Sequence, residues 1–303
     1  MIHEYYSHGK LLLTGEYFVL EGALAFAIPL KAGQRMWVDQ AESNYGELSW
    51  ETKVQEKDWL NAKYNTQDLR IIESSDINRA RYLQKLLLQT KKMSSVLNHS
   101  SVKITNNIEF PTNWGLGSSS SLISNLAFWA NIDPFDLLNS TTEGSGYDIA
   151  CARSNGPILY QLLNEPLIKP VKFEPDFRDH IYFVYLGKKQ DTLKSVLKNK
   201  DKIKNKKLEV DRISQITRSL VESETLHEFE NYLNEHEQIV STSIHEKTVK
   251  SKYFSDFEGS IKSLGAWGGD FILATHAGDS DYVRQYFNRK SMDVIFSYKD
   301  LVL

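Results

Sequence analysis

The segment from Pro111 to Ser121, PTNWGLGSSSS, combines residue types that bind phosphate through the backbone. Gly115 and Gly117 lack side chains, so the backbone there can approach an anion closely. The serines that follow bring hydroxyl and N–H groups to the start of an expected helix, where the helix dipole favours negative charge. A serine hydroxyl at such a position can also bind magnesium. The segment predicts a phosphate site, although an ordinary glycine-rich turn shares the pattern, and no GxxxxGK[ST] motif is present.

Two charged residues elsewhere are candidates for phosphoryl chemistry. Lys10, in SHGKLLLTGEY, comes just before an apolar run, and a lysine beside a transferred phosphoryl group would stabilise its charge. Asp148, in EGSGYDIA, follows a Gly-Ser-Gly turn, from which a carboxylate can orient or deprotonate a hydroxyl nucleophile. Taken alone, each residue also fits an ordinary surface or turn position.

A second glycine-rich segment, KSLGAWGGDFILAT, spans Lys262 to Thr275 and leads into an apolar strand. Its glycines allow close approach of the backbone to a ligand or to another loop. A simple turn is the alternative interpretation.

The elements that must position these segments follow from periodicity and turn signals. Short apolar runs separated by Thr14-Gly15 and Glu21-Gly22 predict strands near the N-terminus, and Ala80, Leu83 and Leu87 have helical spacing. Strands are expected at 11–13, 17–20, 23–30, 34–40, 47–52, 102–108, 158–163, 181–186, 271–275 and 293–297, and helices at 76–89, 119–130, from 133, 211–220, 225–240, 255–263 and 280–287. Residues 148–152 are expected to be helical or extended, and the pattern restarts after Gly156-Pro157.

Composition bounds the class of protein. The 303 residues are 41% hydrophobic and 25% charged, as in globular proteins, and the net charge of -3 argues against a nucleic-acid partner. No apolar run approaches the length of a membrane helix, and no signal peptide is expected. The single cysteine, Cys151, excludes a disulfide within the chain, so we expect a cytoplasmic protein. The nine lysines of residues 188–207 indicate a solvated helix face or a positive rim near a site for acidic ligands.

Taken in order, three segments resemble the motifs of the GHMP kinase superfamily, which includes galactokinase, homoserine kinase, mevalonate kinase and phosphomevalonate kinase. GKLLLTGEYFVLEGALAFAIPL is similar to the opening motif, and PTNWGLGSSSS is similar to the phosphate-binding PxxxGLGSS motif. LGAWGGDFILAT resembles a variant of the third, glycine-rich motif. Order and spacing match over nearly the whole chain, most closely in the mevalonate-kinase-like branch.

The resemblance implies an α+β fold with two domains. An N-terminal mixed α/β domain, residues 1–165, would carry the ATP-binding loop, and a C-terminal ferredoxin-like domain would span residues 166–303. The active site would lie in the cleft between them. The resemblance also implies that ATP is bound by Gly115, Leu116, Gly117, Ser118, Ser119 and Ser120, with Ser119 reaching Mg²⁺.

Further roles follow from the same resemblance. Asp148 matches the catalytic aspartate, and Lys10 matches the lysine that lies near it. Glu16 and Tyr17 fall where that branch has residues on the substrate side, and Thr192 resembles a threonine that starts a helix facing the site.

The chain also departs from the pattern. Trp267 and Asp270 replace glycines of the third motif, where a tryptophan would narrow the cleft and an acid would repel a phosphorylated substrate. The magnesium-binding glutamate of the family has no clear counterpart, and Glu143 is the candidate that we retain.

These features predict an ATP-dependent kinase that transfers the γ-phosphoryl group to a small acidic hydroxy metabolite. Mevalonate is the acceptor that we prefer, with phosphomevalonate kinase and mevalonate diphosphate decarboxylase as alternatives. A non-catalytic regulator that binds a metabolite is the alternative from another class. We expect a monomer or homodimer.

Overall fold

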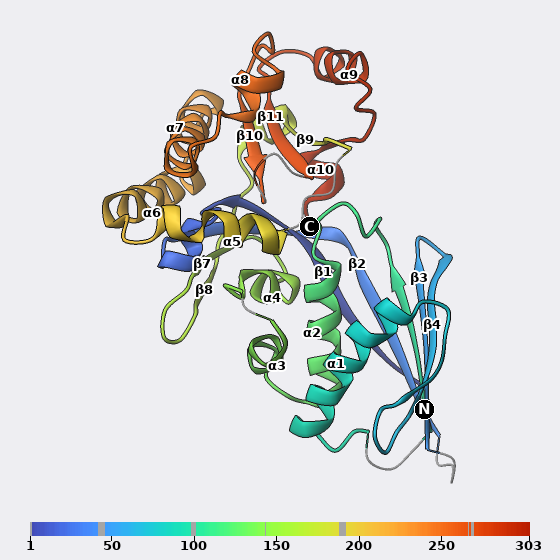
Figure 1. Ribbon diagram of the computed structural model, residues 1–303. Helices are drawn as coiled ribbons and strands as arrows, with labels where there is room; N and C mark the ends of the chain where they lie inside the picture. Colours follow the sequence, from blue (N-terminus) through green and yellow to red (C-terminus); the bar gives the residue numbers. More distant parts are fainter. Residues whose placement is uncertain are drawn as a thin grey trace. The chain divides into compact units, whose positions relative to one another are not determined.

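The computed structural model describes residues 2–41, 46–97, 101–142, 144–187, 192–265, 267 and 270–303 (Figure 1). Their contacts divide the chain into two compact units. The first comprises Met1–Gly9, Ala32–Thr112 and Leu116–Arg153, and the second comprises Lys10–Lys31, Asn113–Gly115 and Ser154–Leu303. In the described part of the chain, no helix is long and apolar enough to cross a membrane.

The strands of the first unit form a mixed sheet in the order β5-β4-β3-β6-β2, and β1 also pairs with β2. Only the β3–β6 pairing in this series is parallel. The bounds are β1 Ile2–Thr14, β2 Ala25–Ala41, β3 Glu47–Val54, β4 Lys57–Asn65, β5 Ile71–Ser74 and β6 Ser101–Ile108. The sequence predicted separate strands at 23–30 and 34–40, but β2 is continuous because the backbone angle that Pro29 imposes is compatible with extended structure.

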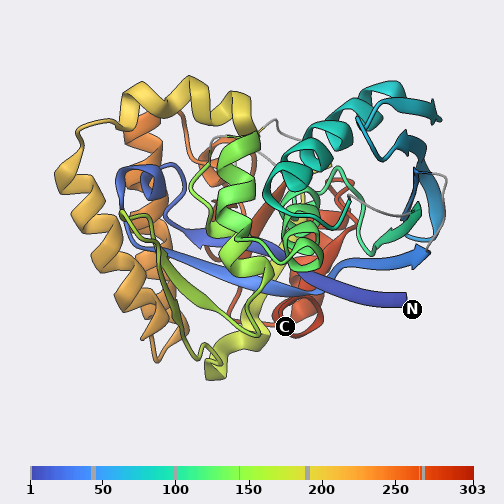
Figure 2. The same ribbon diagram turned by 90° about the horizontal axis from the view of Figure 1, so that it is seen from below.

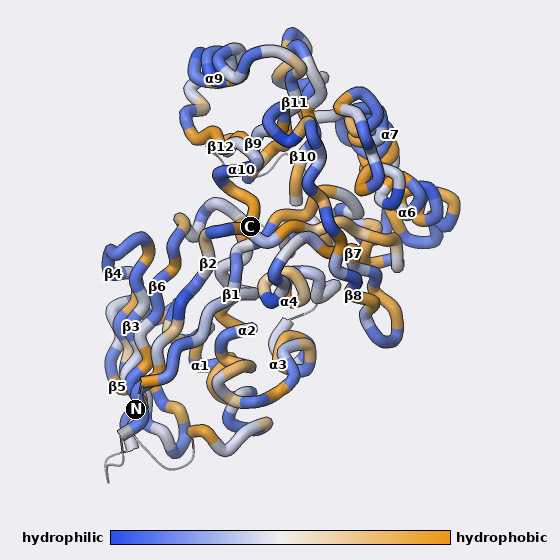
Figure 3. The backbone as a smooth tube through the Cα atoms, turned by 180° about the vertical axis from the view of Figure 1, so that it is seen from behind, coloured by the Kyte–Doolittle hydropathy of each residue, from blue (hydrophilic) through white to orange (hydrophobic). Residues whose placement is uncertain are grey.

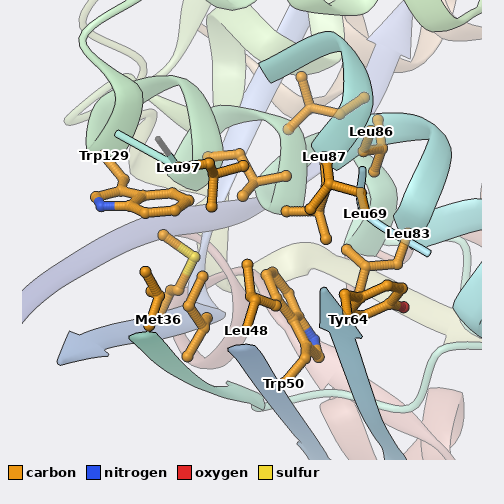
Figure 4. Close-up of a cluster of buried hydrophobic side chains, with 14 of the residues drawn as sticks. Met36, Leu48, Trp50, Tyr64, Leu69, Leu83, Leu86, Leu87, Leu97 and Trp129 are labelled. Atoms are coloured by element: carbon orange, nitrogen blue, oxygen red, sulfur yellow. The ribbon is translucent and has the colours of Figure 1, made fainter. Parts of the chain in front are cut away.

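Four helices belong to the first unit: α1 Ile77–Met93, α2 Ser118–Ala130, α3 Pro134–Thr141 and α4 Tyr147–Ala152. The apolar side chains of α1, including Leu83 and Leu87, meet Leu48, Trp50 and Tyr64 from the sheet in one buried cluster (Figure 4). Burial of each such side chain stabilises the fold by roughly 1.5–3 kcal/mol. The sheet and this cluster therefore fix the helices that carry the predicted phosphate site.

The second unit contains an antiparallel sheet in the order β10-β11-β9-β12. Its strands are β9 Ile181–Tyr185, β10 Ile261–Leu264, β11 Phe271–Thr275 and β12 Ile295–Ser297. Helices α5 Thr192–Ile203, α6 Lys207–Val221, α7 Leu226–Ile244 and α8 Val249–Tyr253 connect β9 to β10, and α9 Ser280–Asn288 connects β11 to β12. This strand order and the positions of the helical connections are those of a ferredoxin-like fold, as predicted.

The remaining elements of the second unit are β7 Ile158–Gln161, β8 Leu167–Pro170, α10 Tyr298–Leu301 and two 3₁₀ helices, Phe18–Glu21 and Asp176–His180. Strand β7 pairs with the first residues of β2 and with β8. Helices α6 and α7 pack side by side (Figures 1 and 2). Hydrophobic and hydrophilic positions alternate along both helices, as expected for helices with one buried face (Figure 3).

Two predicted elements are wrong. The helix expected at 255–263 is instead a loop followed by β10, because Gly259 has φ 133° and all four residues of β10 are buried. A strand buried on both faces lacks the alternation that identifies it. The strand expected at 17–20 is the 3₁₀ helix Phe18–Glu21, preceded by Tyr17 with φ 61°.

Candidate functional site

The start of helix α2 has the geometry of an anion site. Gly117 occupies the N-cap position with φ 92°, and no side chain of the described residues caps this end. The first turn consists of Ser118, Ser119 and Ser120, so N–H groups at this terminus are not satisfied by a capping side chain. Leu116, which precedes the cap, is buried and fixes the loop to the core. Unsatisfied N–H groups and the helix dipole together favour a phosphate here.

The hydroxyl of Ser119 is exposed, and it forms a hydrogen bond with the hydroxyl of Tyr82 on α1. Either oxygen can donate this bond, so Ser119 keeps a lone pair for a further partner. Tyr82 thereby fixes the rotamer of the serine that the sequence singled out for magnesium.

A buried chain of polar contacts anchors α2 to the sheet. Ser7 on β1 contacts Ser124 and Asn125 at 2.9 and 2.8 Å, and Asn125 Nδ2 donates to the carbonyl of Gln34 on β2 at 2.9 Å. The Ser121 hydroxyl lies 2.8 Å from Gln34 Oε1. Buried polar groups of this kind have specific partners, so the chain sets the rotation of the helix as well as its depth.

Asp148 lies in the first turn of α4, which begins after Gly146 with φ 81°. The side chain of Asp148 is half-buried. Helix α4 packs against α2, so the first unit brings the predicted catalytic aspartate and the predicted phosphate-binding serines onto neighbouring helices.

Gly115 belongs to the second unit, where the side chains of Lys10 and Asp270 lie against it. Its φ is 69°, and its carbonyl accepts a hydrogen bond of 3.4 Å from Lys10 Nζ. A Cβ added at this glycine would lie 1.9 Å from Asp270 Oδ2, so the buried carboxylate of Asp270 lies directly against it. The second unit therefore brings Lys10 and Asp270 to the glycine that begins the predicted phosphate loop.

The preceding residue, Trp114, is held by aromatic side chains of the small sheet. Its ring centroid lies 5.6 Å from Tyr185, 5.8 Å from Phe271 and 5.7 Å from Phe296. The hydroxyl of Tyr185 also donates to the carbonyl of Asn113 at 3.2 Å. Aromatic pairs at such separations stabilise by about 0.5–1.5 kcal/mol beyond area burial, so the start of the loop is firmly positioned.

Tyr17 connects the opening motif with the third motif. Its hydroxyl bonds Ser195 Oγ of α5 at 2.7 Å and accepts from the N–H of Trp267 at 2.9 Å. Trp267 is 7% exposed and packs with Tyr17 and Phe18 in one apolar cluster, so its indole forms core, contrary to the expectation that it narrows a cleft. Thr192 begins α5, but its side chain lies outside the described residues, as does Glu143.

Glu16 forms part of a buried group of charged side chains. Its carboxylate pairs with the ammonium of Lys262 on β10, and both side chains are almost fully buried. His236 Nε2 on α7 accepts from the Gly15 N–H at 2.8 Å and lies 3.4 Å from Glu16 Oε2. Burial raises the pKa of Glu16 and lowers the pKa of His236 well below its usual value. The imidazole is therefore neutral, with its proton on Nδ1.

The neighbouring residue on α7, Glu237, accepts hydrogen bonds from the backbone and the hydroxyl of Ser263 at 3.2 and 3.0 Å. Burial raises the pKa of Glu237 to about 7. Glu16 and Glu237 are thus both held close to Lys262, and the predicted substrate-side role of Glu16 remains a prediction.

Neither a family model nor a curated protein matches this sequence, but solved structures match its fold. Phosphomevalonate kinase from Streptococcus pneumoniae, in complex with phosphomevalonate and AMPPNP, aligns with a TM-score of 0.70 at 17% identity, over 97% of this chain and 99% of that chain. Mevalonate kinase from Methanococcus jannaschii aligns with a TM-score of 0.69 at 18% identity, over 98% and 96%. Mevalonate kinase from L. major, in complex with R-mevalonate, aligns with a TM-score of 0.67 at 16% identity, over 97% and 94%.

The chain has the GHMP kinase fold. This confirms the fold predicted from the sequence, because the matches span nearly all of this chain and of each neighbour.

Within this fold, the groups present fit a nucleotide better than an all-protein metal centre. The first turn of α2 offers N–H and hydroxyl groups that suit phosphate. Among the residues described, no three His, Cys, Asp or Glu side chains are grouped to hold a metal ion. The Ser119 hydroxyl suits Mg²⁺, which commonly takes few protein ligands together with phosphate oxygens and water.

Sequence reasoning did not single out the buried polar residues Lys262, His236 and Glu237. One signal was available: His236 and Glu237 fall on the helix face that also carries Leu233 and Val240, where polar residues are unexpected. The matching signal for Lys262 was hidden, because its strand was expected to be helical.

Proposed function

We propose that this protein is an ATP-dependent kinase that phosphorylates a small acidic hydroxy metabolite. The observation that carries the proposal is the uncapped, serine-rich start of α2, a helix that packs against α4, which bears Asp148. Positioning and charge stabilisation are the main requirements for phosphoryl transfer, and these residues can supply both. The shared fold supports the same class of reaction.

In the proposed mechanism, the backbone from Gly115 to Ser120 holds the phosphates of ATP. Asp148 orients the acceptor hydroxyl and takes its proton as the oxygen attacks the γ-phosphorus, and the bond to the ADP oxygen breaks. Lys10 stabilises the negative charge that develops. Magnesium, when bound, neutralises phosphate charge, and Ser119 would hold it.

Mevalonate is the acceptor that we propose first. The GEYFVLEG opening and the GSGYDIA aspartate support it, and mevalonate kinases are among the structural neighbours. Phosphomevalonate is the second candidate, because a phosphomevalonate kinase is also among the structural neighbours.

The test is release of ADP from ATP with mevalonate, phosphomevalonate or mevalonate diphosphate as the second substrate. We expect turnover with mevalonate; turnover with phosphomevalonate instead would move the proposal to the second acceptor. Release of CO₂ from the diphosphate would indicate a decarboxylase. Binding of nucleotide or metabolite without ADP formation would support the non-catalytic regulator.

The variant Asp148→Asn tests the mechanism, because asparagine keeps the shape but cannot accept the proton. We expect kcat to fall at least ~10²-fold. A thermal unfolding midpoint like that of the wild type is the control for folding, and a near-normal kcat would remove Asp148 from the reaction.

A further inference from the structure

The turn that joins β1 to the 3₁₀ helix in the second unit is strained. Tyr17 has φ 61° and ψ −48°, and the N–H of Phe18 donates to the carbonyl of Glu16 at 2.7 Å. A hydrogen bond across a single residue with positive φ defines the rare, strained form of the γ-turn. Such conformations persist only where the surrounding structure holds them, and they gather at functional sites.

Buried polar contacts from two other elements hold this turn. Lys262 on β10 donates to the carboxylate of Glu16 and, at 2.9 Å, to the carbonyl of Ser263. His236 on α7 accepts the N–H of Gly15 at 2.8 Å. Lys262 and His236 are 0% exposed, so these contacts are shielded from solvent.

The strained residue in turn holds the third motif. The N–H of Trp267, within the glycine-rich segment Leu264–Asp270, donates to the Tyr17 hydroxyl at 2.9 Å. The same hydroxyl bonds Ser195 on α5 at 2.7 Å. Movement of Tyr17 would therefore release the backbone of Trp267 from the opening motif.

We infer that Lys262 is a positioning residue. Through its ion pair with Glu16, Lys262 holds Tyr17 in place, and Tyr17 in turn holds the third motif in place for the acceptor substrate. The part of this inference that concerns the acceptor rests on the proposed kinase function. The contacts between Lys262, Glu16, Tyr17 and Trp267 do not depend on that function. A role in stability alone explains Lys262 less well, because desolvation offsets most of the attraction within a buried ion pair.

The test uses a neutral replacement of the pair in the full-length protein. Lys262→Met alone leaves the Glu16 carboxylate buried without its partner, so it will lower the unfolding midpoint whatever its role. The double variant Glu16→Gln with Lys262→Met removes both charges and should recover most of that midpoint. Tyr17→Phe removes only the hydroxyl that accepts the hydrogen bond from the Trp267 N–H. Lys250→Met is the matched control, because it removes a lysine contact to the Gly259 carbonyl elsewhere in the same unit.

The first readout is hydrogen exchange at the Trp267 amide, which needs no enzymatic activity. We expect exchange at least ~10-fold faster in the double variant and in Tyr17→Phe, with no change in Lys250→Met, because an amide exchanges when its hydrogen bond opens. Amides of β9 should be unaffected in the double variant, in Tyr17→Phe and in Lys250→Met. Unchanged exchange in a double variant of normal stability would overturn the inference.

The second readout is kinetic. We expect KM for the acceptor to rise at least ~10-fold in the double variant while KM for ATP stays near normal, since the loss is of acceptor binding. Faster exchange with unchanged acceptor KM would leave Lys262 a structural residue and refute the positioning role. If the wild type turns over no acceptor, the proposed function fails, and the exchange measurement still decides whether Lys262 holds the motif.

Discussion

At the scale of single residues, Gly115 has no room for a side chain, because the carboxylate of Asp270 lies directly against it. We expect Gly115→Ala to destabilise the protein and to raise KM for ATP, because a Cβ would lie 1.9 Å from Asp270 Oδ2 and the backbone φ is 69°. The positive φ alone costs about 1–2 kcal/mol in a residue with a side chain. Urea unfolding and an ATP titration measure the two effects.

The double variant Gly115→Ala with Asp270→Gly separates the overlap from the backbone strain. Removal of the carboxylate relieves the overlap but leaves the positive φ, so the double-mutant cycle should show a coupling of at least ~1 kcal/mol. Additive effects of the two substitutions on unfolding would show that the carboxylate does not press on Gly115.

Glu237 gives a pH dependence whose sign can be worked out. Burial raises its pKa from 4.5 to about 7, opposed by Lys262 and assisted by Glu16. Because its pKa is raised in the folded state, the Glu237 carboxyl contributes its full stabilisation below pH 4.5. This stabilisation, about 3 kcal/mol in total, is lost as the pH rises through 7. His236 titrates in the opposite sense, because its pKa is lowered.

Glu237→Gln isolates this contribution, because it removes one titration and leaves that of His236. The free energy of unfolding of the variant minus that of the wild type should rise by roughly 2–3 kcal/mol between pH 5 and pH 8. Urea unfolding at several pH values measures this difference, and a constant difference across the range would refute it.

The sequence singled out Asp148, whose catalytic role stays a prediction, and did not single out the buried residues Lys262, His236 and Glu237. Asp148 follows a glycine turn, and this local signal sufficed to single it out. The structure adds that its helix, α4, packs against α2, which carries the serines. Lys262 has no local signal, since its partner Glu16 is 246 residues away. Only the pairing of β10 with β11 fixes where the Lys262 side chain lies.

At the scale of elements, the position of α2 depends on a few buried polar contacts. We expect Asn125→Ala to lower the free energy of unfolding by about 2–4 kcal/mol, because it removes contacts to Ser7 and Gln34 and leaves their polar atoms buried. Asn78→Ala, at an exposed position on α1, is the matched control and should change stability by less than about 0.5 kcal/mol. Equal effects of the two substitutions in urea unfolding would show that the polar chain does not anchor the helix.

Elements with strong local signals were predicted well. Helix α1 begins as expected after Asp76, whose side chain accepts from Asn78 and Arg79 N–H groups. Thr225 and Glu228 form a capping box at the start of α7. The failures have a tertiary cause: β10 is defined by pairing with β11, and the γ-turn at Tyr17 is held by residues from α5, α7 and β10. Contacts of this range leave no periodic trace in the sequence.

At the scale of the whole molecule, the second unit is assembled from distant parts of the chain. Lys10–Lys31 belongs with Ser154–Leu303, and within this unit β2 residues 25–27 pair with β7. The hydroxyl of Thr14 also bonds Thr217 at 2.8 Å. The restart of the sequence pattern after Gly156-Pro157 marks where new elements begin, but it contains no information about the N-terminal segment that these elements enclose.

This assembly predicts that a fragment of residues 166–303 does not fold cooperatively by itself. Without Glu16, Lys262 would be a buried charge without its carboxylate, and loss of one partner of a buried pair costs about 3–5 kcal/mol. Loss of Tyr17 and Phe18 would also open the apolar cluster that contains Trp267 and Val240. A fragment that begins at Ser154 and carries residues 10–31 on a flexible C-terminal linker restores these contacts, so it should unfold cooperatively in urea. Cooperative unfolding of the shorter fragment with similar stability would show that the N-terminal segment is not part of this unit's core.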